Sequence, residues 1–267
     1  MTNIETEEPL YIADGTPLYA RDFTTALKHV GITKGDIVLV HSDISVFGKL
    51  CTFNREFLFS NLLNELKNIV TEEGLIIMPT FSYSFCENRV FDRDQTKSKV
   101  GVLTEYFREQ PDVVRTVHPI FSFAIWGENK SSFLQISKDS FDKNSIFGKL
   151  HEQKGKILFL GAPFQSCTFI HYIEQMYGVP YRYMKKFSGI IKTKDFDYSD
   201  NYSYFVRDLE KKKNELDLSR LEKFLLQNNI LKSVFIGNGR VLLINSEQLY
   251  LETWDLLDKD IEFLLKE

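Results

Sequence analysis

Blocks of apolar and polar residues alternate along this chain and predict helices and strands in turn. Apolar residues recur at helical spacing in four segments, 24–30, 57–70, 102–108 and 167–177. Short uninterrupted apolar runs, typical of strands buried on both faces, lie between them at 37–40, 75–78, 122–126 and 156–160. This alternation predicts an α/β fold in which a central mixed sheet is covered by helices on both faces.

The pattern changes at about residue 190. A charged amphipathic segment that contains Lys211-Lys212-Lys213 predicts a helix running to about Gln227, and Asn238-Gly239 between two apolar runs predicts a β-hairpin. No linker or internal repeat interrupts the chain. We therefore expect one domain over residues 1–267, in which about 190–267 form a smaller α+β lobe on the substrate side, with disorder confined to the first dozen residues.

Composition narrows the class of protein. The 267 residues are 43% hydrophobic with a formal net charge of −4, which predicts a real core and no overall attraction for nucleic acid or membrane surfaces. The three cysteines show no CxxC spacing, and no apolar run approaches the ~20 residues that span a bilayer. We expect a cytoplasmic protein that acts on small molecules, with the choice between monomer and homodimer left open.

Polar side chains cluster where the predicted strands end, which is where open α/β sheets bind ligands. The segments are His41–Ser45 after the first strand, Pro79–Ser82 after the second, Arg115–Pro119 before the third, and Ser166–His171 after the fourth. His41, His118 and His171 lie in this set. We therefore expect the functional site to contain one or more of these histidines.

Taken in order, these segments resemble the aminoglycoside 3-N-acetyltransferase family over roughly residues 20 to 190. The matching segments are Gly35–Ser45, Ile77–Phe81, Val114–Pro119 with Ser122, Phe147-Gly148, and Leu160-Gly161 leading to Thr168-x-x-His171-x-x-Glu174 with Pro180-Tyr181. Two positions depart from the family pattern. Asp43 stands where serine is usual, and Ile146 where proline is usual.

The resemblance implies an N-acyltransferase in which an amine attacks the thioester of acetyl-CoA or another acyl-CoA directly, with no metal. His171 matches the general base, and a neutral imidazole suits that role near pH 7. Asp197 is the best match to the acid that orients it, with Asp195 and Asp200 as alternatives. Thr168, or a nearby loop amide, could donate a hydrogen bond to the developing oxyanion.

The resemblance also assigns binding residues. Those matching the coenzyme-binding loops are Ser42, Asp43, Ile44, Ser45, Phe47, Arg115, Thr116, His118 and Ser122. Those expected on the substrate side are Phe81, Glu174, Tyr181 and Arg182. For Glu174 the choice between contact with a cationic substrate and a solvated position on the helix is open.

The acceptor is expected to be an amino sugar. Several cations favour a nucleotide-linked sugar because they suit a pyrophosphate, namely Arg89, Arg93, Lys97, Lys99, Arg182, Lys185 and Lys186. One alternative is that the cations near residue 90 only balance Glu87, Asp92 and Asp94 on a solvated loop. Another is that the acceptor is an aminoglycoside antibiotic. Two other classes remain, a metal-assisted hydrolase using His41, His118 and His171, and a non-catalytic acyl-CoA-binding protein.

Overall fold

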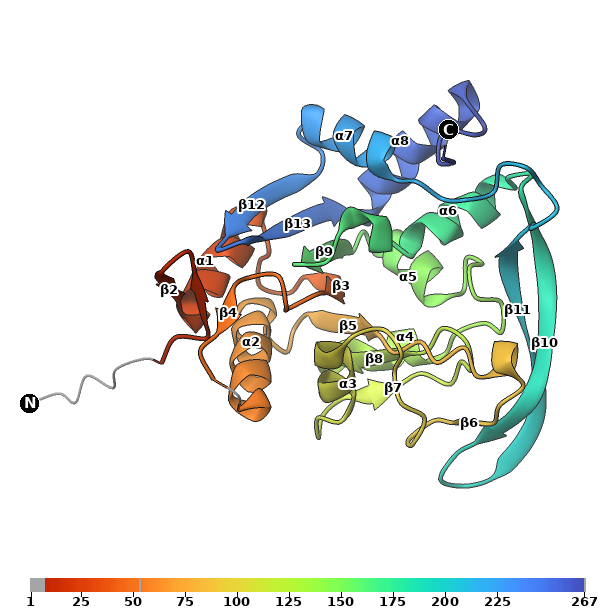
Figure 1. The fold of residues 1–267 in the computed structure, drawn as a ribbon. Helices are drawn as coiled ribbons and strands as arrows, with labels where there is room; N and C mark the ends of the chain where they lie inside the picture. Colours follow the sequence, from red (N-terminus) through yellow and green to blue (C-terminus); the bar gives the residue numbers. More distant parts are fainter. Residues whose placement is uncertain (1–7, 53, 267) are drawn as a thin grey trace, which may run out of the picture.

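The apolar runs of the sequence form the central sheet. The computed structural model describes residues 8–52 and 54–266. Within them seven strands lie in the order β12-β13-β9-β3-β5-β8-β7, with β3 parallel to β5 and β9 and the other neighbours antiparallel (Figure 1). Their bounds are β3 (Ile37–Ser42), β5 (Leu75–Pro79), β7 (Val114–Arg115), β8 (Phe123–Trp126), β9 (Lys156–Leu160), β12 (Lys232–Ile236) and β13 (Gly239–Asn245). The predicted mixed sheet is confirmed.

Two hydrophobic cores lie on the two faces of this sheet, because side chains alternate along each strand. On β3, Val38 and Val40 belong to one core and Leu39 to the other. The first core is covered by α1 (Ala20–Val30), α2 (Arg55–Val70) and α3 (Val102–Arg108). The second is covered by α5 (Ile146–Glu152), α6 (Phe169–Tyr177), α7 (Ser219–Gln227) and α8 (Ser246–Lys259). The prediction of helices on both faces is therefore confirmed.

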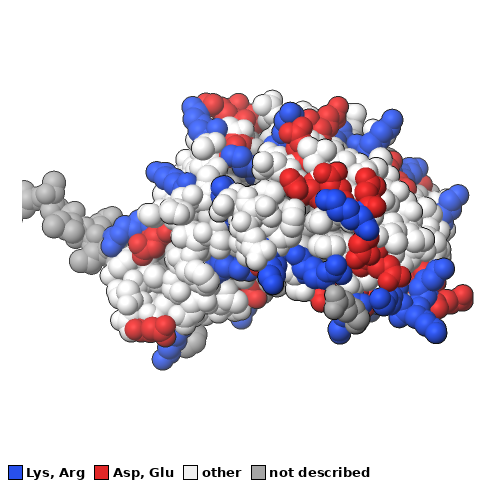
Figure 2. Space-filling view, turned by 90° about the horizontal axis from the view of Figure 1, so that it is seen from above, with Lys and Arg blue, Asp and Glu red and all other residues white. Residues whose placement is uncertain are grey.

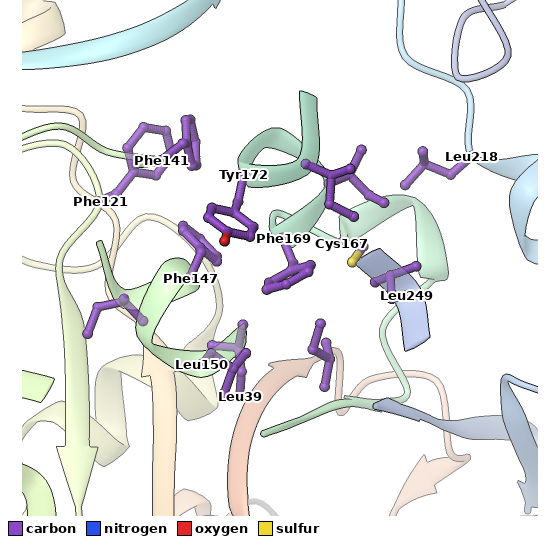
Figure 3. Packing of buried hydrophobic residues seen from close by; sticks show 14 of the residues in the cluster. Leu39, Phe121, Phe141, Phe147, Leu150, Cys167, Phe169, Tyr172, Leu218 and Leu249 are labelled. Atoms are coloured by element: carbon purple, nitrogen blue, oxygen red, sulfur yellow. The ribbon is translucent and has the colours of Figure 1, made fainter. Parts of the chain in front are cut away.

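Aromatic packing holds helix α6 against the sheet. Figure 3 shows Phe147, Phe169 and Tyr172 grouped between α5 and α6, with Phe121 and Phe141 beside them. The ring centroids of Phe169 and Tyr172 are 5.2 Å apart, and those of Phe147 and Phe169 are 6.3 Å apart. Each such buried ring stabilises the fold by about 1.5–3 kcal/mol. Helix α6 is therefore fixed against the sheet, and the side chains on its outer face have a rigid support.

Two smaller sheets flank the central one. Near the N-terminus, β1 (Tyr11–Ala13) pairs with β2 (Thr16–Leu18) and β4 (Lys49–Leu50). On the opposite side, β10 (Arg182–Lys192) and β11 (Asp197–Arg207) form a long hairpin that pairs with β6 (Phe91–Asp92) (Figure 1). The remaining short elements are η1 (Phe85–Glu87), η2 (Glu128–Lys130), α4 (Ser131–Leu134) and η3 (Phe164–Ser166).

The C-terminal residues do not form a lobe apart from the sheet. Strands β12 and β13 are two of the seven central strands, and α8 packs on the second core. Of the part after residue 190, the outer half of the β10–β11 hairpin projects along the side of the molecule (Figure 1). None of the described helices is both long and apolar enough to cross a membrane.

Two local predictions are corrected. Residues 211–213 are not helical, because the Asn214 side chain donates hydrogen bonds to the carbonyls of Asp208 and Lys211 and holds a turn. Helix α7 begins only at Ser219. The β12–β13 turn consists of Gly237 and Asn238, one residue earlier than predicted, since Ile236 pairs with Gly239. Within the first dozen residues, Tyr11 and Ile12 lie in β1.

Candidate active site

A cleft opens at the end of β3, on the face of the sheet covered by α2 and α3. Its volume is about 530 Å³. Four of the residues expected to bind the coenzyme line it, Ser42, Asp43, Ile44 and Ser45. The other lining residues are mostly apolar and come from β4, α2 and the start of α3, namely Leu50, Arg55, Leu58, Phe59, Val100, Gly101, Val102 and Leu103. We call this the coenzyme cleft.

The loop that borders the cleft is held by its own side chains. Asp43 Oδ1 accepts hydrogen bonds from the Ser45 amide at 3.1 Å and the Ser45 hydroxyl at 2.6 Å. Gly161, with φ of 76°, packs so closely that a Cβ there would lie 2.1 Å from the Asp43 carbonyl oxygen. Asp43 therefore shapes the loop from within, which explains how a carboxylate is tolerated at this position.

A second, smaller cavity lies at the other side of the β3 end. Its volume is about 300 Å³. It shares Ser42, Asp43 and Val100 with the coenzyme cleft, so the two spaces border the same end of the strand. Its remaining lining residues are His41, Pro79, Phe81, Tyr83, Ala162, Pro163, Ser166 and Thr168. We call this the inner cavity.

His171 lies on α6, one turn after Thr168, and hydrogen-bonds to Glu174. His171 Nδ1 is 2.6 Å from Glu174 Oε2, and the same carboxylate oxygen is 2.8 Å from Arg182 Nε. The side chains of Glu174 and Arg182 are 0% and 5% exposed, whereas that of His171 is 20% exposed. A buried carboxylate thus joins a buried guanidinium to an imidazole that reaches the surface.

The charge state of Glu174 decides which imidazole nitrogen carries the proton. Burial alone would raise the pKa of this carboxyl, but the hydrogen bond and charge of His171, with the charge of Arg182, outweigh burial and lower the pKa. Glu174 is therefore an ionised acceptor for the Nδ1–H of His171. In the neutral form of the ring, Nε2 then keeps a lone pair that can accept a proton.

The structure does not bring Asp197 to His171. Asp197 pairs with Lys192 at the outer end of the hairpin, ten residues along β10 from Arg182, or about 33 Å at the usual rise per residue. Asp200 forms an ion pair with Lys138 at 2.8 Å, and Asp195 lies exposed between the two strands. The acid that contacts His171 in the structure is therefore Glu174 and not Asp197, and the i,i+3 spacing of Glu174 from His171 was visible in the sequence.

Four other expected coenzyme residues are internal. The Arg115 side chain donates to the Thr80 carbonyl at 2.7 Å and to the Ser122 hydroxyl at 3.1 Å. His118 Nδ1 accepts from the amides of Ile120 and Phe121. Thr116 accepts from the Phe123 amide at 2.9 Å. None of the four, Arg115, Thr116, His118 or Ser122, lines the coenzyme cleft or the inner cavity. They hold the β7–β8 edge in place.

The three aromatic residues assigned to the site lie in different places. Phe47 is fully buried, with its ring centroid 4.9 Å from that of Phe23, so it packs in the core and does not line the coenzyme cleft. Phe81, which is expected on the substrate side, lines the inner cavity. Tyr181 is buried near Glu174, and burial together with the Glu174 charge raises its pKa. Glu174, Tyr181 and Arg182 are thus buried, whereas His171, which contacts Glu174, is partly exposed.

The cations expected to meet a pyrophosphate are largely paired with acids. Glu87 forms ion pairs with Arg89 and Lys99, and Arg93 with Asp94 at 3.2 Å. Arg182 faces Glu174, and the Lys185 ammonium lies 5.3 Å from the centre of the Phe187 ring. Figure 2 shows basic and acidic side chains interspersed over the face that it displays. The charge balance of this segment favours the alternative in which these residues neutralise one another.

The described residues contain no group of three or more His, Cys, Asp or Glu side chains placed to hold a metal ion. His118 is bonded to backbone amides and His171 to Glu174. The three histidines of the hydrolase alternative are therefore not arranged as a set of metal ligands. Sequence reasoning also missed the α2 and α3 side of the cleft, because Leu58, Phe59 and Leu103 read as ordinary core positions.

Comparisons with known proteins show which family the chain is related to. The sequence model of the aminoglycoside 3-N-acetyltransferase family matches residues 39–258. The chain is 30% identical over 190 residues to the SPbeta prophage-derived aminoglycoside N(3')-acetyltransferase-like protein YokD of Bacillus subtilis, covering 62% of this chain and 67% of that protein. It is 28% identical over 159 residues to aminoglycoside N(3)-acetyltransferase IV of Salmonella sp., covering 58% of each chain.

The same fold is found among solved structures. AAC-IIIb, solved as a binary complex with CoASH, superposes with a TM-score of 0.75 over 90% of this chain and 96% of its own, at 20% identity. At this identity the likeness concerns the fold alone. The fold therefore extends over more of the chain than the matched sequence segments do.

Proposed function

This chain belongs to the aminoglycoside 3-N-acetyltransferase family, and we propose that it transfers the acetyl group of acetyl-CoA to an amino group of an aminoglycoside. Family membership confirms the resemblance drawn from the motifs and the enzyme class of an acyl-CoA-dependent N-acyltransferase. The observation that carries the proposal is the 2.6 Å contact between His171 and Glu174, one turn after Thr168, which lines a cavity that shares Ser42, Asp43 and Val100 with the coenzyme cleft.

The residues of the cleft suit coenzyme A. The apolar side chains of Leu58, Phe59 and Leu103 can pack on the pantetheine arm, and Arg55 offers a cation for a phosphate. Ser42 Oγ is buried without a hydrogen-bond partner among the described residues, so the cleft holds a polar group that a ligand can satisfy. When bound, acetyl-CoA supplies an activated acyl group as a thioester.

The protein's own part in the reaction is to manage one proton. His171 Nε2 accepts a proton from the attacking amine, which must be the free base, and the resulting imidazolium is stabilised by ionised Glu174. Arg182 keeps Glu174 ionised inside the protein. The proton then returns to the leaving sulfur, so no covalent enzyme intermediate is needed.

The acceptor is proposed on two grounds. The relatives named above are an aminoglycoside N(3')-acetyltransferase-like protein and an aminoglycoside N(3)-acetyltransferase. Of the cations that favoured a nucleotide-linked sugar, Arg93, Lys99 and Arg182 are paired with Asp94, Glu87 and Glu174. A nucleotide-linked amino sugar is the competing acceptor.

The test is a screen of acceptors with release of the coenzyme thiol as readout. Acetyl-CoA is offered with several aminoglycosides and with nucleotide-linked 3- and 4-amino sugars, and NMR locates the new amide on any product. Because Cys51 is exposed, a Cys51→Ser background avoids reaction of the protein with the thiol reagent. We expect higher kcat/KM for an aminoglycoside. Clear preference for a nucleotide-linked sugar would refute the proposed acceptor, and no thiol release with any amine would refute transfer.

A further inference from the structure

His41 occupies a distinctive place at the end of β3. Side chains alternate along this strand, so His41 lies on the face of the sheet that α6 covers. It pairs with Phe159 of β9 in the strand register, and the two rings stack with centroids 5.3 Å apart. His41 is 6% exposed. It also lines the inner cavity, as does Thr168 at the start of α6.

One ring nitrogen of His41 is unsatisfied. Its Nε2 is buried and has no hydrogen-bond partner among the residues that the structure describes. Leaving a buried polar group unbonded costs about 1–3 kcal/mol, so such atoms are rare unless something else bonds to them. Burial lowers the pKa of His41 to about 4. At neutral pH the imidazole is therefore uncharged, with one N–H to donate and little capacity to take up a proton.

The position of the two cavities indicates what reaches His41. The inner cavity and the coenzyme cleft share Ser42, Asp43 and Val100, so a ligand in the cleft has only to extend past these residues to reach the inner cavity. On the far side of that cavity, Thr168 precedes His171 by one turn. If acetyl-CoA binds in the cleft and the amine is deprotonated by His171, the acyl carbon must lie between them. His41 borders that space.

We propose that His41 donates a hydrogen bond to the acyl carbonyl oxygen of the bound thioester and acts with Thr168 as its oxyanion-binding pair. The proposal rests on the proposed function, because it takes the inner cavity as the place of transfer. A neutral imidazole suits the task, since a donor that does not release its own proton polarises the carbonyl without competing with the base.

The step balances without further reactants. The amine nitrogen forms a bond to the acyl carbon, and the carbonyl electron pair moves onto the oxygen that His41 and Thr168 bind. His171 takes the proton from nitrogen. The carbonyl reforms as the carbon–sulfur bond breaks, and the proton on His171 passes to the sulfur, giving an amide and free coenzyme A. His41 keeps its proton throughout.

The first test needs no amine. Acetyl-CoA labelled with ¹³C at the carbonyl is bound to the protein, and isotope-edited infrared spectroscopy records the carbonyl stretch. A hydrogen bond lowers this frequency relative to that of free acetyl-CoA. We expect the wild-type complex to show the lowered band and His41→Phe to lose it. His29→Gln, which alters an exposed histidine, is the control and should keep the band.

A second pair of variants keeps the test decisive if the phenylalanine does not fold. The amide nitrogen of glutamine can reach the Nε2 position and that of asparagine the Nδ1 position, so one of His41→Gln and His41→Asn should retain the lowered band. We expect the other to lower kcat by about 10²- to 10³-fold, the usual effect of removing one oxyanion donor. Its affinity for free coenzyme A, which lacks the carbonyl, should be unchanged.

An equal carbonyl frequency in wild type and in every His41 variant would overturn the proposal, as would wild-type kcat in all of them. These outcomes differ from failure of the proposed function. A protein that shows the lowered band but acetylates no aminoglycoside would refute the acceptor and leave the role of His41 standing.

Discussion

His171 Nδ1 lies 2.6 Å from Glu174 Oε2, three residues later on the same helix. The two side chains therefore meet without help from any distant loop. Because Glu174 is fully buried and also faces Arg182 at 2.8 Å, the imidazole is held in one tautomer by a carboxylate that cannot turn towards water. The first three predictions follow from these contacts.

Replacing His171 with alanine should remove most turnover and leave coenzyme binding intact. General-base catalysis contributes about 10²- to 10⁴-fold to the rate and little to ground-state affinity. Steady-state kinetics with the best acceptor would measure the first, and calorimetric titration with coenzyme A the second. Wild-type turnover in His171→Ala would show that another group is the base.

Glu174→Gln and Asp197→Asn separate the two candidate acids. Glutamine is nearly isosteric but cannot stabilise the imidazolium, so we expect kcat to fall by at least about 10²-fold. Asp197→Asn should retain wild-type kcat, because Asp197 lies at the outer end of the hairpin. Loss of activity in Asp197→Asn alone would restore the original assignment.

Glu174→Gln should also destabilise the fold, since it leaves Arg182 buried without its counter-charge. Breaking a buried ion pair by removing one partner costs about 3–5 kcal/mol. Urea denaturation measures this cost. The double variant Glu174→Gln/Arg182→Met should recover part of the loss, and no recovery would argue against a direct charge effect.

Bulk in the coenzyme cleft should abolish stabilisation by acetyl-CoA. A ligand at 100 times its Kd stabilises the folded state by about 2.7 kcal/mol, which raises the melting temperature. Ser45→Trp places an indole in the cleft and should erase the rise. Ser132→Trp, on the exposed helix α4, is the matched control. An unchanged rise with Ser45→Trp would place the coenzyme elsewhere.

Two glycines with similar backbone angles should respond differently to alanine. Gly161 and Gly178 have φ of 76° and 82°, but a Cβ at Gly161 would lie 2.1 Å from the Asp43 carbonyl, whereas at Gly178 no atom lies within 4 Å. Gly178→Ala should cost about 1–2 kcal/mol from the left-handed backbone alone. Gly161→Ala should cost more and weaken the acetyl-CoA effect by moving the Asp43 loop. Equal costs would contradict the close packing.

Acid should destabilise the protein through its buried histidines. Burial lowers the pKa of His41 to about 4 and that of His118 to about 3, below the ordinary value of 6.5. Between pH 6.5 and 4 the unfolded chain binds protons that the folded chain excludes. The stability that these neutral histidines contribute is therefore fully present above pH 6.5. As the pH is lowered below 6.5, the free energy of unfolding decreases by about 1.4 kcal/mol per pH unit for each histidine. In His41→Gln the slope of unfolding free energy against pH should shrink by one histidine's share, and in His29→Gln it should not.

Short-range pattern was enough to predict most of the fold. The strands at 37–40, 75–78 and 156–160 were predicted because a strand buried on both faces must be apolar throughout. The helix at 102–108 follows from its apolar spacing. Local pattern was insufficient at residues 211–213, where side-chain hydrogen bonds from Asn214 favour a turn over a helix.

The candidate site divides along the same line. The motifs of the sequence identified Ser42–Ser45, which line the cleft, and His171, which contacts Glu174. These residues lie near strand and helix ends that the pattern predicts. The sequence could not show that Arg115 and His118 are internal, that Asp197 lies at the far end of a hairpin, or that the cations near residue 90 are paired with acids. Those facts depend on contacts between residues far apart in the chain. Such contacts are set by how the sheet, the hairpin and α6 pack, and a periodicity of two or 3.6 residues carries no information about them.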